Sequence, residues 1–470
     1  MQQVYHSANC EPEADSQKES PVFDYESPKE YKIKVVKFGG TSLADAGQFK
    51  KTASIIKAEE SRRYVVPSAP GKRFDGDIKV TDMLYKCYEM ASNGEDITEY
   101  FEGIAQRYRD IIDGLGLDGF SLEDEFAKIK NSFISKAGRD YAASRGEYLS
   151  GRVMARYLGY TFIDPANAIF FTEDGRFDSE RTNTVLGKVL EKHTTAVIPG
   201  FYGSMPNDTI KTFSRGGSDI TGSIVARAAN ADIYENWTDV SGLLMADPRI
   251  VDDPRVIKII TYSELRELSY MGATVLHEDA IFPVRFAGIP INIRNTNDPS
   301  APGSMIVSMA KQPPENRITG IAGKKGFCVL TIEKDMMNSE LGFGRRVLEV
   351  IEKHGVSFEH LPSGIDTMSV VINEKALDGK RDRIITDICK AVEPESVFVE
   401  SGLALLAVVG RGMKNAKGTA AKLFRAIAEA DVSVRTIDQG SSEMNIIVGV
   451  DENDFEKALR SIYREFVVYS

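Results

Sequence analysis

The C-terminal part of the chain contains an internal repeat, and this feature constrains the fold more than any other. A shift of 76 residues without gaps superposes the following pairs: Leu330 and Leu406, Met337 and Met413, Gly342 and Gly418, Ile351 and Ile427, and Gly364 and Gly440. Each copy has the pattern of a strand, a glycine-containing loop, a helix, two strands joined by a turn, and a second helix, which predicts a βαββαβ unit. We therefore expect two small domains, at 318–394 and 395–470, whose sheets pair and whose loops form pockets for small ligands.

A different pattern precedes the repeat, at residues 31–310. The run IKVVKF at 33–38, a Gly-Gly turn, a helical segment at about 46–60 and the run RYVVPSA at 63–69 predict a βαβ unit. Further strand and helix patterns follow in alternation, and a chain of 470 residues exceeds what one hydrophobic core usually supports. We expect a separate αβα sandwich with a mainly parallel sheet, in which ligands bind beyond the carboxyl ends of the strands.

Charge and cysteine content exclude several classes of function. The formal net charge is -11 and no run of lysine and arginine occurs, which argues against a nucleic-acid partner. The 4 cysteines are scattered without disulfide or metal-ligand spacing, so we expect no metal site and a reducing compartment. No apolar run approaches the length of a membrane span, and residues 1–30 lack the apolar core of a signal peptide. These observations predict a cytoplasmic enzyme with a flexible N-terminal extension at 1–30.

The segment TFSRGGSDITGS at 212–223 places a double-glycine turn between a strand and a helix. Gly216 and Gly217 let the backbone approach a ligand closely, and the helix amides that follow face an anion. Arg215 can bind a carboxylate or a phosphate through two parallel hydrogen bonds. The pattern predicts a site for a small anionic substrate; a solvated turn with an ion pair is the alternative interpretation.

The segment KFGGTS at 37–42 predicts a phosphate-binding turn. It combines a lysine at a strand end, two glycines whose amides can converge on phosphate oxygens, two hydroxyl groups and a helix N-terminus. The alternative is a plain β-to-α turn. Neither a GxxxxGK[ST] loop nor the HRD and DFG pair occurs in the sequence, so a P-loop or protein-kinase fold is not supported.

A resemblance to aspartate kinase rests on several motifs in that family's order. They are KFGGTS at 37–42, SRGEYLSG at 144–151, VIPGFYG at 197–203, FSRGGSD at 213–219, WTDVSGLLMADPRIV at 237–251 and GATVLH at 272–277. The repeat resembles the paired ACT regulatory domains of that family, so the resemblance covers roughly residues 32–470. Because the chain ends with the second repeat, we expect a monofunctional enzyme without a fused homoserine dehydrogenase.

The resemblance implies transfer of the γ-phosphoryl group of ATP, taken up with Mg²⁺, to the side-chain carboxylate of L-aspartate. The product, 4-phospho-L-aspartate, leads to lysine, threonine and methionine. Lys37 and the amides of Gly39 and Gly40 would neutralise the transferred group, with Ser42 nearby. Asp219 would position Lys37 and could contact the metal.

The resemblance also implies how aspartate and the nucleotide are held. Arg215 would bind the α-carboxylate and Glu147 the α-ammonium of aspartate. Further positions that match the substrate side are Ser68, Thr81, Phe201, Gly216, Gly217 and Ser218. Positions that match the nucleotide side are Thr238, Asp239, Leu244, Arg249 and Thr274. A strand end with an Asx-type turn is the alternative for the Thr-Asp pair.

Two of the nucleotide positions depart from the family pattern. Thr274 stands where many relatives carry a lysine, which removes a cation from the nucleotide phosphates. Leu244 stands where many relatives carry a tyrosine near the adenine. We therefore expect these two contacts with ATP to differ from those of the family.

The first repeat resembles an effector pocket for an amino acid, lysine and/or threonine. The positions that carry this resemblance are Met337, Asn338, Ser339, Phe343, Gly344, Glu359, Ser363, Gly364, Ile365 and Asp366. Helix amides would take the effector's carboxylate, and Glu359 or Asp366 a cationic side chain such as that of lysine. Paired repeats from two chains would form the pockets, so we expect a homo-oligomer, a dimer at least. A loop that only caps the helix is the alternative.

Two other functions compete with an aspartate kinase. One is a kinase of the same fold that acts on glutamate, acetylglutamate or another small acceptor, and the other is a catalytically inactive amino-acid sensor. The tandem repeats argue against the first. The presence of Lys37, Glu147, Arg215 and Asp219 together argues against the second, because an inactive sensor should have lost at least one of them.

Overall fold

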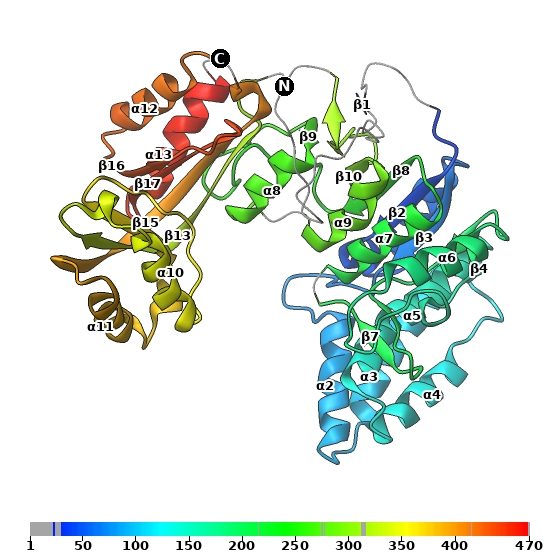
Figure 1. Ribbon diagram of the computed structural model, residues 1–470. Coiled ribbons are helices and arrows are strands. Elements are labelled where there is room, and N and C mark those ends of the chain that lie inside the picture. The colour runs from blue at the N-terminus through cyan, green and yellow to red at the C-terminus, as the bar shows by residue number, and fades with distance from the viewer. Residues whose placement is uncertain are drawn as a thin grey trace. The chain divides into compact units, whose positions relative to one another are not determined.

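The computed structural model describes residues 22–23, 30–214, 216–273, 276, 278–311, 316–414 and 416–468, and the chain divides into two compact units (Figure 1). Unit 1 comprises Met1–Ser241 and Asp279–Gln312, and unit 2 comprises Gly242–Glu278 and Pro313–Ser470. The sequence predicts one domain over 31–310, whereas the segment Gly242–Glu278 groups with the repeats. The first unit is therefore discontinuous in sequence.

Unit 1 is built around a mainly parallel sheet. Its strands follow the order β4 (Thr161–Phe162), β5 (Ala196–Val197), β3 (Arg62–Pro67), β2 (Lys34–Phe38), β8 (Ile233–Thr238), β10 (Ile291–Asn295) and β11 (Ser304–Val307). Neighbouring strands run parallel from β4 to β10, and β11 runs antiparallel to β10. Every residue of β2 is buried, as expected where helices cover both faces of a parallel sheet. The predicted αβα sandwich with a mainly parallel sheet is confirmed.

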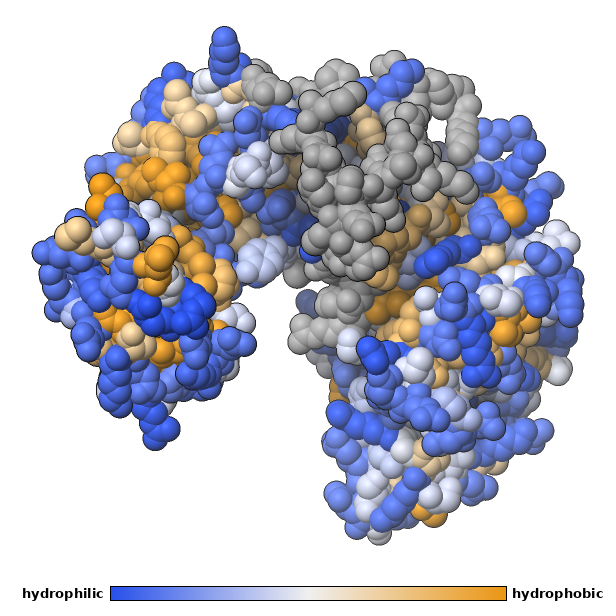
Figure 2. Space-filling model, viewed as in Figure 1, coloured by the Kyte–Doolittle hydropathy of each residue, from blue (hydrophilic) through white to orange (hydrophobic). Residues whose placement is uncertain are grey.

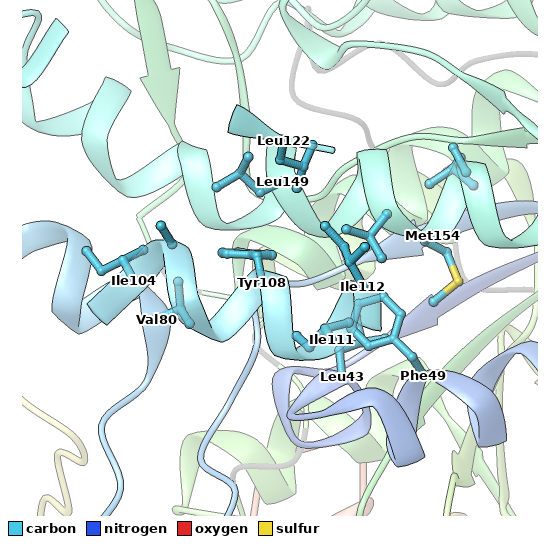
Figure 3. Packing of buried hydrophobic residues seen from close by; sticks show 14 of the residues in the cluster. Leu43, Phe49, Val80, Ile104, Tyr108, Ile111, Ile112, Leu122, Leu149 and Met154 are labelled. Carbon is cyan, nitrogen blue, oxygen red and sulfur yellow. The ribbon is translucent and has the colours of Figure 1, made fainter. Parts of the chain in front are cut away.

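A large hydrophobic core lies on one face of this sheet. The helices that contribute to it are α1 (Ala46–Lys57), α2 (Val80–Ser92), α3 (Thr98–Leu115), α4 (Glu123–Ile134) and α5 (Arg139–Leu158). Tyr108 and Met154 are among the buried side chains that pack together there (Figure 3), and Trp237 joins them from the sheet. The sequence predicts helix over 122–150, but the helix is broken at Gly138, whose φ of 106° favours glycine.

The other face of the sheet carries α7 (Gly217–Ala228), which packs on β2, β3 and β8, and α6 (Ser179–Leu190) packs on α7. A hairpin of β6 (Tyr202–Ser204) and β7 (Ile210–Thr212) precedes α7, and α9 (Glu278–Ala287) precedes β10. β1 (Val22–Phe23) pairs in parallel with β12 (Met309–Ala310), so these residues of the extension predicted to be flexible belong to a sheet. No helix in the described ranges is long and apolar enough to cross a membrane.

Unit 2 contains an antiparallel sheet and the helices of the repeat. The strands follow the order β14 (Thr367–Asn373), β13 (Gly320–Glu333), β15 (Ser396–Val409), β17 (Asn445–Asp451) and β16 (Val434–Asp438). The helices are α10 (Phe343–Lys353), α11 (Arg381–Val392), α12 (Thr419–Glu429) and α13 (Phe455–Tyr463). The segment before the repeats adds β9 (Ile259–Thr261) and α8 (Tyr262–Tyr270). Gly342 and Gly418, which the repeat superposes, both precede a helix in the left-handed conformation, with φ of 77° and 83°.

The longest strands of unit 2, β13 and β15, pair with each other along two stretches. Residues 320–324 of β13 pair with 405–409 of β15, and residues 327–333 of β13 pair with 396–403 of β15, with irregular register between them. Residues 320–324, at the start of the first predicted repeat, therefore extend the sheet that β17 and β16 form in the second repeat. The contiguous boundaries predicted at 318–394 and 395–470 cut across this exchange of strands.

Candidate active site

Functional side chains of unit 1 gather where β2, β8 and α7 meet. Lys37, near the end of β2, lies opposite Asn236 of β8 in the parallel register. The buried Lys37 places its Nζ 2.6 Å from Oδ1 of Asp219 in the first turn of α7. Asn236 Nδ2 donates a hydrogen bond of 2.9 Å to the same Asp219 oxygen, and Lys37 Nζ donates one of 3.3 Å to Asn236 Oδ1. The structure thus brings together two predicted residues, and it adds Asn236, which the sequence did not indicate.

The glycine turn after β2 forms the 3-10 helix Gly40–Leu43. A Cβ on Gly40 would lie 2.9 Å from the carbonyl oxygen of Ala69 in the loop after β3, so this close approach requires glycine. The Gly39 amide donates a hydrogen bond of 3.0 Å to the carbonyl oxygen of Trp237. Contrary to the expectation, the Gly39 amide therefore serves the sheet and not a phosphate group.

Ser42 is held by a residue that the sequence did not single out. Its side chain is buried, and its hydroxyl shares a hydrogen bond of 2.8 Å with the hydroxyl of Thr296, just after β10. Thr296 is fixed in turn, because its backbone N–H donates to the Thr238 carbonyl oxygen at 2.8 Å. Ser42 is thus anchored to the carboxyl end of β8 and β10.

The second glycine turn packs against Phe201. Gly216, the residue just before α7, is in the left-handed conformation with a φ of 60°. A Cβ on Gly217 would lie 2.3 Å from Cδ2 of Phe201, which itself has a φ of 84°, a strained value for a residue other than glycine. Ser218 follows in the first turn of α7 and is largely buried. Arg215, the predicted clamp for a carboxylate, lies outside the described residues.

Glu147 is a buried carboxyl group on α5, with 6% of the residue exposed. Burial raises the pKa of Glu147 to about 8, although a hydrogen bond with the backbone of Ala69 acts against this shift. Its Oε2 has no hydrogen-bond partner among the described residues. Two further predicted substrate positions are Ser68, in the loop after β3, and Thr81, in the first turn of α2. A buried carboxyl group with a free oxygen suits a cationic ligand.

The predicted nucleotide residues are divided between the two units. Thr238 ends β8, and its hydroxyl donates a hydrogen bond of 3.2 Å to the exposed side chain of Asp239. In unit 2, Leu244 is half-buried, and the exposed Arg249 pairs with Asp247 at 2.6 Å. Thr274 lies outside the described residues.

The predicted effector residues occupy two adjoining segments of the first repeat. Met337, Asn338 and Ser339 form a 3-10 turn, Phe343 and Gly344 begin α10, and the other segment holds Glu359, Ser363, Gly364, Ile365 and Asp366. The Asn338 amide donates to the Ile365 carbonyl oxygen at 3.1 Å, and the Met336 amide to Asp366 Oδ1 at 2.9 Å. The Glu359 side chain accepts a hydrogen bond from the hydroxyl of Tyr270 on α8.

The comparisons with known proteins agree with this architecture. Residues 32–295 match the model of the amino acid kinase family, and residues 406–466 match that of the ACT domain. The fold and the site thus define a kinase of the amino acid kinase class that carries a regulatory module. Over 448 residues the chain is 38% identical to aspartokinase 3 of Bacillus subtilis (strain 168), with 92% of this chain and 98% of the relative covered.

Solved structures give the same result. The crystal structure of Clostridium acetobutylicum aspartate kinase is 53% identical, with a TM-score of 0.86, and the match covers 92% of this chain and 100% of that one. E. coli aspartokinase III in complex with aspartate and ADP, at 23% identity and a TM-score of 0.69 over 92% of this chain and 99% of that one, shares the fold. The chain belongs to the aspartate kinases. It is an ATP-dependent enzyme of amino-acid biosynthesis that phosphorylates L-aspartate and is regulated allosterically.

Proposed function

We propose that the γ-phosphoryl group of ATP passes to the β-carboxylate of L-aspartate at Lys37, Asp219 and the turn Gly40–Leu43. The observation that carries this proposal is the ion pair of Lys37 and Asp219, which lies at the carboxyl ends of β2 and β8 beside the start of α7. This edge is where a parallel sheet binds its ligands.

The reaction needs positioning and charge neutralisation more than it needs a base. A carboxylate oxygen of aspartate bonds to the γ-phosphorus, the bond from that phosphorus to the bridging oxygen breaks, and ADP leaves with the electron pair. Because the carboxylate of aspartate is ionised at neutral pH, no proton has to move. Lys37 supplies a cation to the transferred group, and Asp219 fixes the direction of the ammonium group.

The nucleotide arrives as its magnesium complex. Mg²⁺ usually keeps phosphate oxygens and waters as ligands and takes one or two carboxylates from the protein. Asp219, whose side chain is 20% exposed, would be the carboxylate ligand of such an ion. No group of three metal-ligating side chains occurs in the part of the chain that the structure describes. The proposed nucleotide contacts are Thr238, Asp239, Leu244, Arg249 and Thr274.

Aspartate is recognised by charge at its α-carbon. Glu147 would receive the α-ammonium group, because its buried Oε2 lacks a partner among the described residues. Arg215 would bind the α-carboxylate, and Ser68, Thr81, Phe201, Gly217 and Ser218 would line the site. This pairing distinguishes an amino acid from a plain dicarboxylate.

A coupled assay of ADP release tests the proposed reaction. We expect turnover with ATP and L-aspartate together, and no more than background when L-glutamate or acetylglutamate replaces aspartate. Hydroxylamine trapping of the acyl phosphate, with identification of the product as the β-hydroxamate of aspartate, would show that the β-carboxylate is the acceptor. Equal turnover with glutamate would overturn the choice of substrate, and no turnover with any acceptor would favour the inactive sensor.

The first repeat would bind the feedback effector, lysine and/or threonine. The two segments that carry the predicted residues are hydrogen-bonded to each other through Asn338 and Asp366, and Glu359 and Asp366 provide negative charge. A cationic amino acid such as lysine suits this charge. The effector inhibits only by binding better to a less active state.

Replacing Glu359 with glutamine should weaken inhibition by lysine. The change removes a charge-assisted hydrogen bond of roughly 1.5 to 3 kcal/mol, so the lysine concentration for half-inhibition should rise about 10-fold or more. Each variant's rate without lysine serves as its own reference. Glu349→Gln is the control, because Glu349 is partly exposed on α10 and pairs with Arg345 at 2.9 Å. An unchanged inhibition curve for Glu359→Gln, or an equal shift for the control, would contradict this assignment.

We also propose a cytoplasmic homo-oligomer, a dimer at least. Figure 2 shows apolar patches on the surface of the unit that carries the repeats, and Leu341, Ile365 and Phe358 are exposed there. Such side chains suit a contact with a second copy. Cys87, Cys328 and Cys389 are unpaired, which suits a reducing compartment.

A further inference from the structure

Asn236 occupies a special place in the sheet of unit 1. β8 lies between β2 and β10, and the register sets Asn236 directly opposite Lys37 on one side and Ile293 on the other. Opposed residues of neighbouring strands point to the same face, so Asn236 and Lys37 both project toward α7. Asn236 is 4% exposed, so its amide has to find its partners within the protein.

The Asn236 amide connects the two charged groups of the site. Its oxygen accepts from Lys37 Nζ at 3.3 Å, and its nitrogen donates to Asp219 Oδ1 at 2.9 Å. Only this orientation of the amide satisfies both neighbours, because an ammonium group only donates and a carboxylate only accepts. A neutral side chain with one acceptor and one donor therefore joins a cation to an anion without adding charge.

This connection limits how the ammonium group of Lys37 can turn. One of its three N–H groups points to Asp219 at 2.6 Å and a second to Asn236 at 3.3 Å. The third N–H remains for an oxygen of the transferred phosphoryl group. A donor whose direction is set before the reaction stabilises developing charge without reorganisation.

The strand that carries Asn236 is anchored on its other face. Glu235 is 1% exposed and accepts hydrogen bonds from Arg62 Nε at 2.8 Å and from Trp237 Nε1 at 2.9 Å. Lys34 Nζ lies 3.3 Å from the same carboxylate. Burial raises the pKa of Glu235, but Arg62, Lys34 and Arg294 outweigh it and hold the pKa below its usual value. This ionic network anchors β8 on the face of the sheet opposite Asn236.

We propose that Asn236 is a positioning residue for phosphoryl transfer, which holds Lys37 and Asp219 in the arrangement that the transition state requires. The inference rests on the roles proposed above for those two residues. Asn236 does not reach aspartate or ATP itself in this assignment, so its removal should change kcat far more than either KM.

Two substitutions and one control test the proposal. Asn236→Leu keeps the approximate volume and removes both hydrogen bonds, and it should lower kcat about 10- to 100-fold with both KM values within about threefold. Asn236→Asp keeps the shape, but it sets a second carboxylate against Asp219, and its loss of kcat should be at least as large. Tyr234→Phe is the control, because the Tyr234 hydroxyl donates to the backbone oxygen of Asp219 at 3.2 Å and not to its side chain.

The Tyr234→Phe variant should have a lower melting temperature than the wild type, while its kcat stays within about twofold of the wild-type value. A kcat within twofold of the wild type in Asn236→Leu would overturn the inference, and so would a loss in Tyr234→Phe equal to that in Asn236→Leu. If Asn236→Leu does not fold, Asn236→Asp decides, and wild-type turnover from it refutes the proposal. Lys37→Ala distinguishes a failure of the proposed site from a failure of this inference. Activity in Lys37→Ala refutes the proposed site. Activity in the Asn236 variants together with its loss in Lys37→Ala refutes this inference alone.

Discussion

Lys37→Ala is expected to lower kcat by about 100-fold or more, the scale of losing one preorganised electrostatic contact with the reacting group. Lys37 is a cation held at the carboxyl end of β2 by Asp219 and Asn236. Alanine removes the charge, and Asp219 keeps its hydrogen bond from Asn236 and a side chain that is 20% exposed. The variant should therefore fold, and the loss should appear in turnover.

The measurement is kcat at saturating ATP and aspartate, together with a thermal melt of each protein. Lys32→Ala is the matched control, because Lys32 is an exposed lysine just before the same strand. It should keep the wild-type rate. A folded Lys37→Ala variant with turnover near that of the control would mean that another cation serves the transferred group, and the proposed site would be wrong.

The sequence predicted the parts of the structure that depend on local backbone demands. The repeat predicts a glycine-containing loop before a helix in each copy, and Gly342 and Gly418 stand there in the left-handed conformation that glycine tolerates. The break at Gly138 also has a local cause, its φ of 106°, but the apolar pattern of 122–150 continues through it and hides the loop. Periodicity alone therefore joins two helices that a glycine separates.

Residues that depend on strand pairing were not predictable. Asn236 reaches Lys37 only because β8 lies beside β2, although the two residues are 199 positions apart. The same reason explains the exchange of strands between the repeats, because the register of β13 against β15 follows from no single segment. The sequence does not show which strands lie beside each other, so it named Lys37 and Asp219 as candidates but not the Asn236 amide that joins them.

Glu147→Gln is expected to raise the KM for aspartate strongly and to leave the KM for ATP nearly unchanged. Glutamine fills the same space on α5 but cannot form the ion pair with the α-ammonium group. A charge-assisted hydrogen bond contributes roughly 1.5 to 3 kcal/mol, so the KM should rise about 10- to 100-fold. Equal changes in both KM values would mean that Glu147 supports the fold or the nucleotide.

The pH dependence of the aspartate KM gives an independent readout. Burial raises the pKa of Glu147 to about 8 in the free protein, so this group holds a proton at neutral pH. Aspartate requires the ionised form, and binding therefore releases that proton. The wild-type KM for aspartate should fall as the pH rises toward 8 and level off above it, whereas Glu147→Gln should lack this titration.

Protein stability should respond to the same substitution. The pKa of Glu147 is raised in the folded protein from its usual value of 4.5, so its contribution to stability is fully present below pH 4.5 and is lost as the pH rises to about 8. Within that window the loss approaches about 1.4 kcal/mol per pH unit from this group. Because glutamine does not titrate, the Glu147→Gln variant should gain stability relative to the wild type between pH 5 and about pH 8. Urea unfolding of both proteins across this range measures the difference, and parallel curves would show that Glu147 is already ionised in the free enzyme.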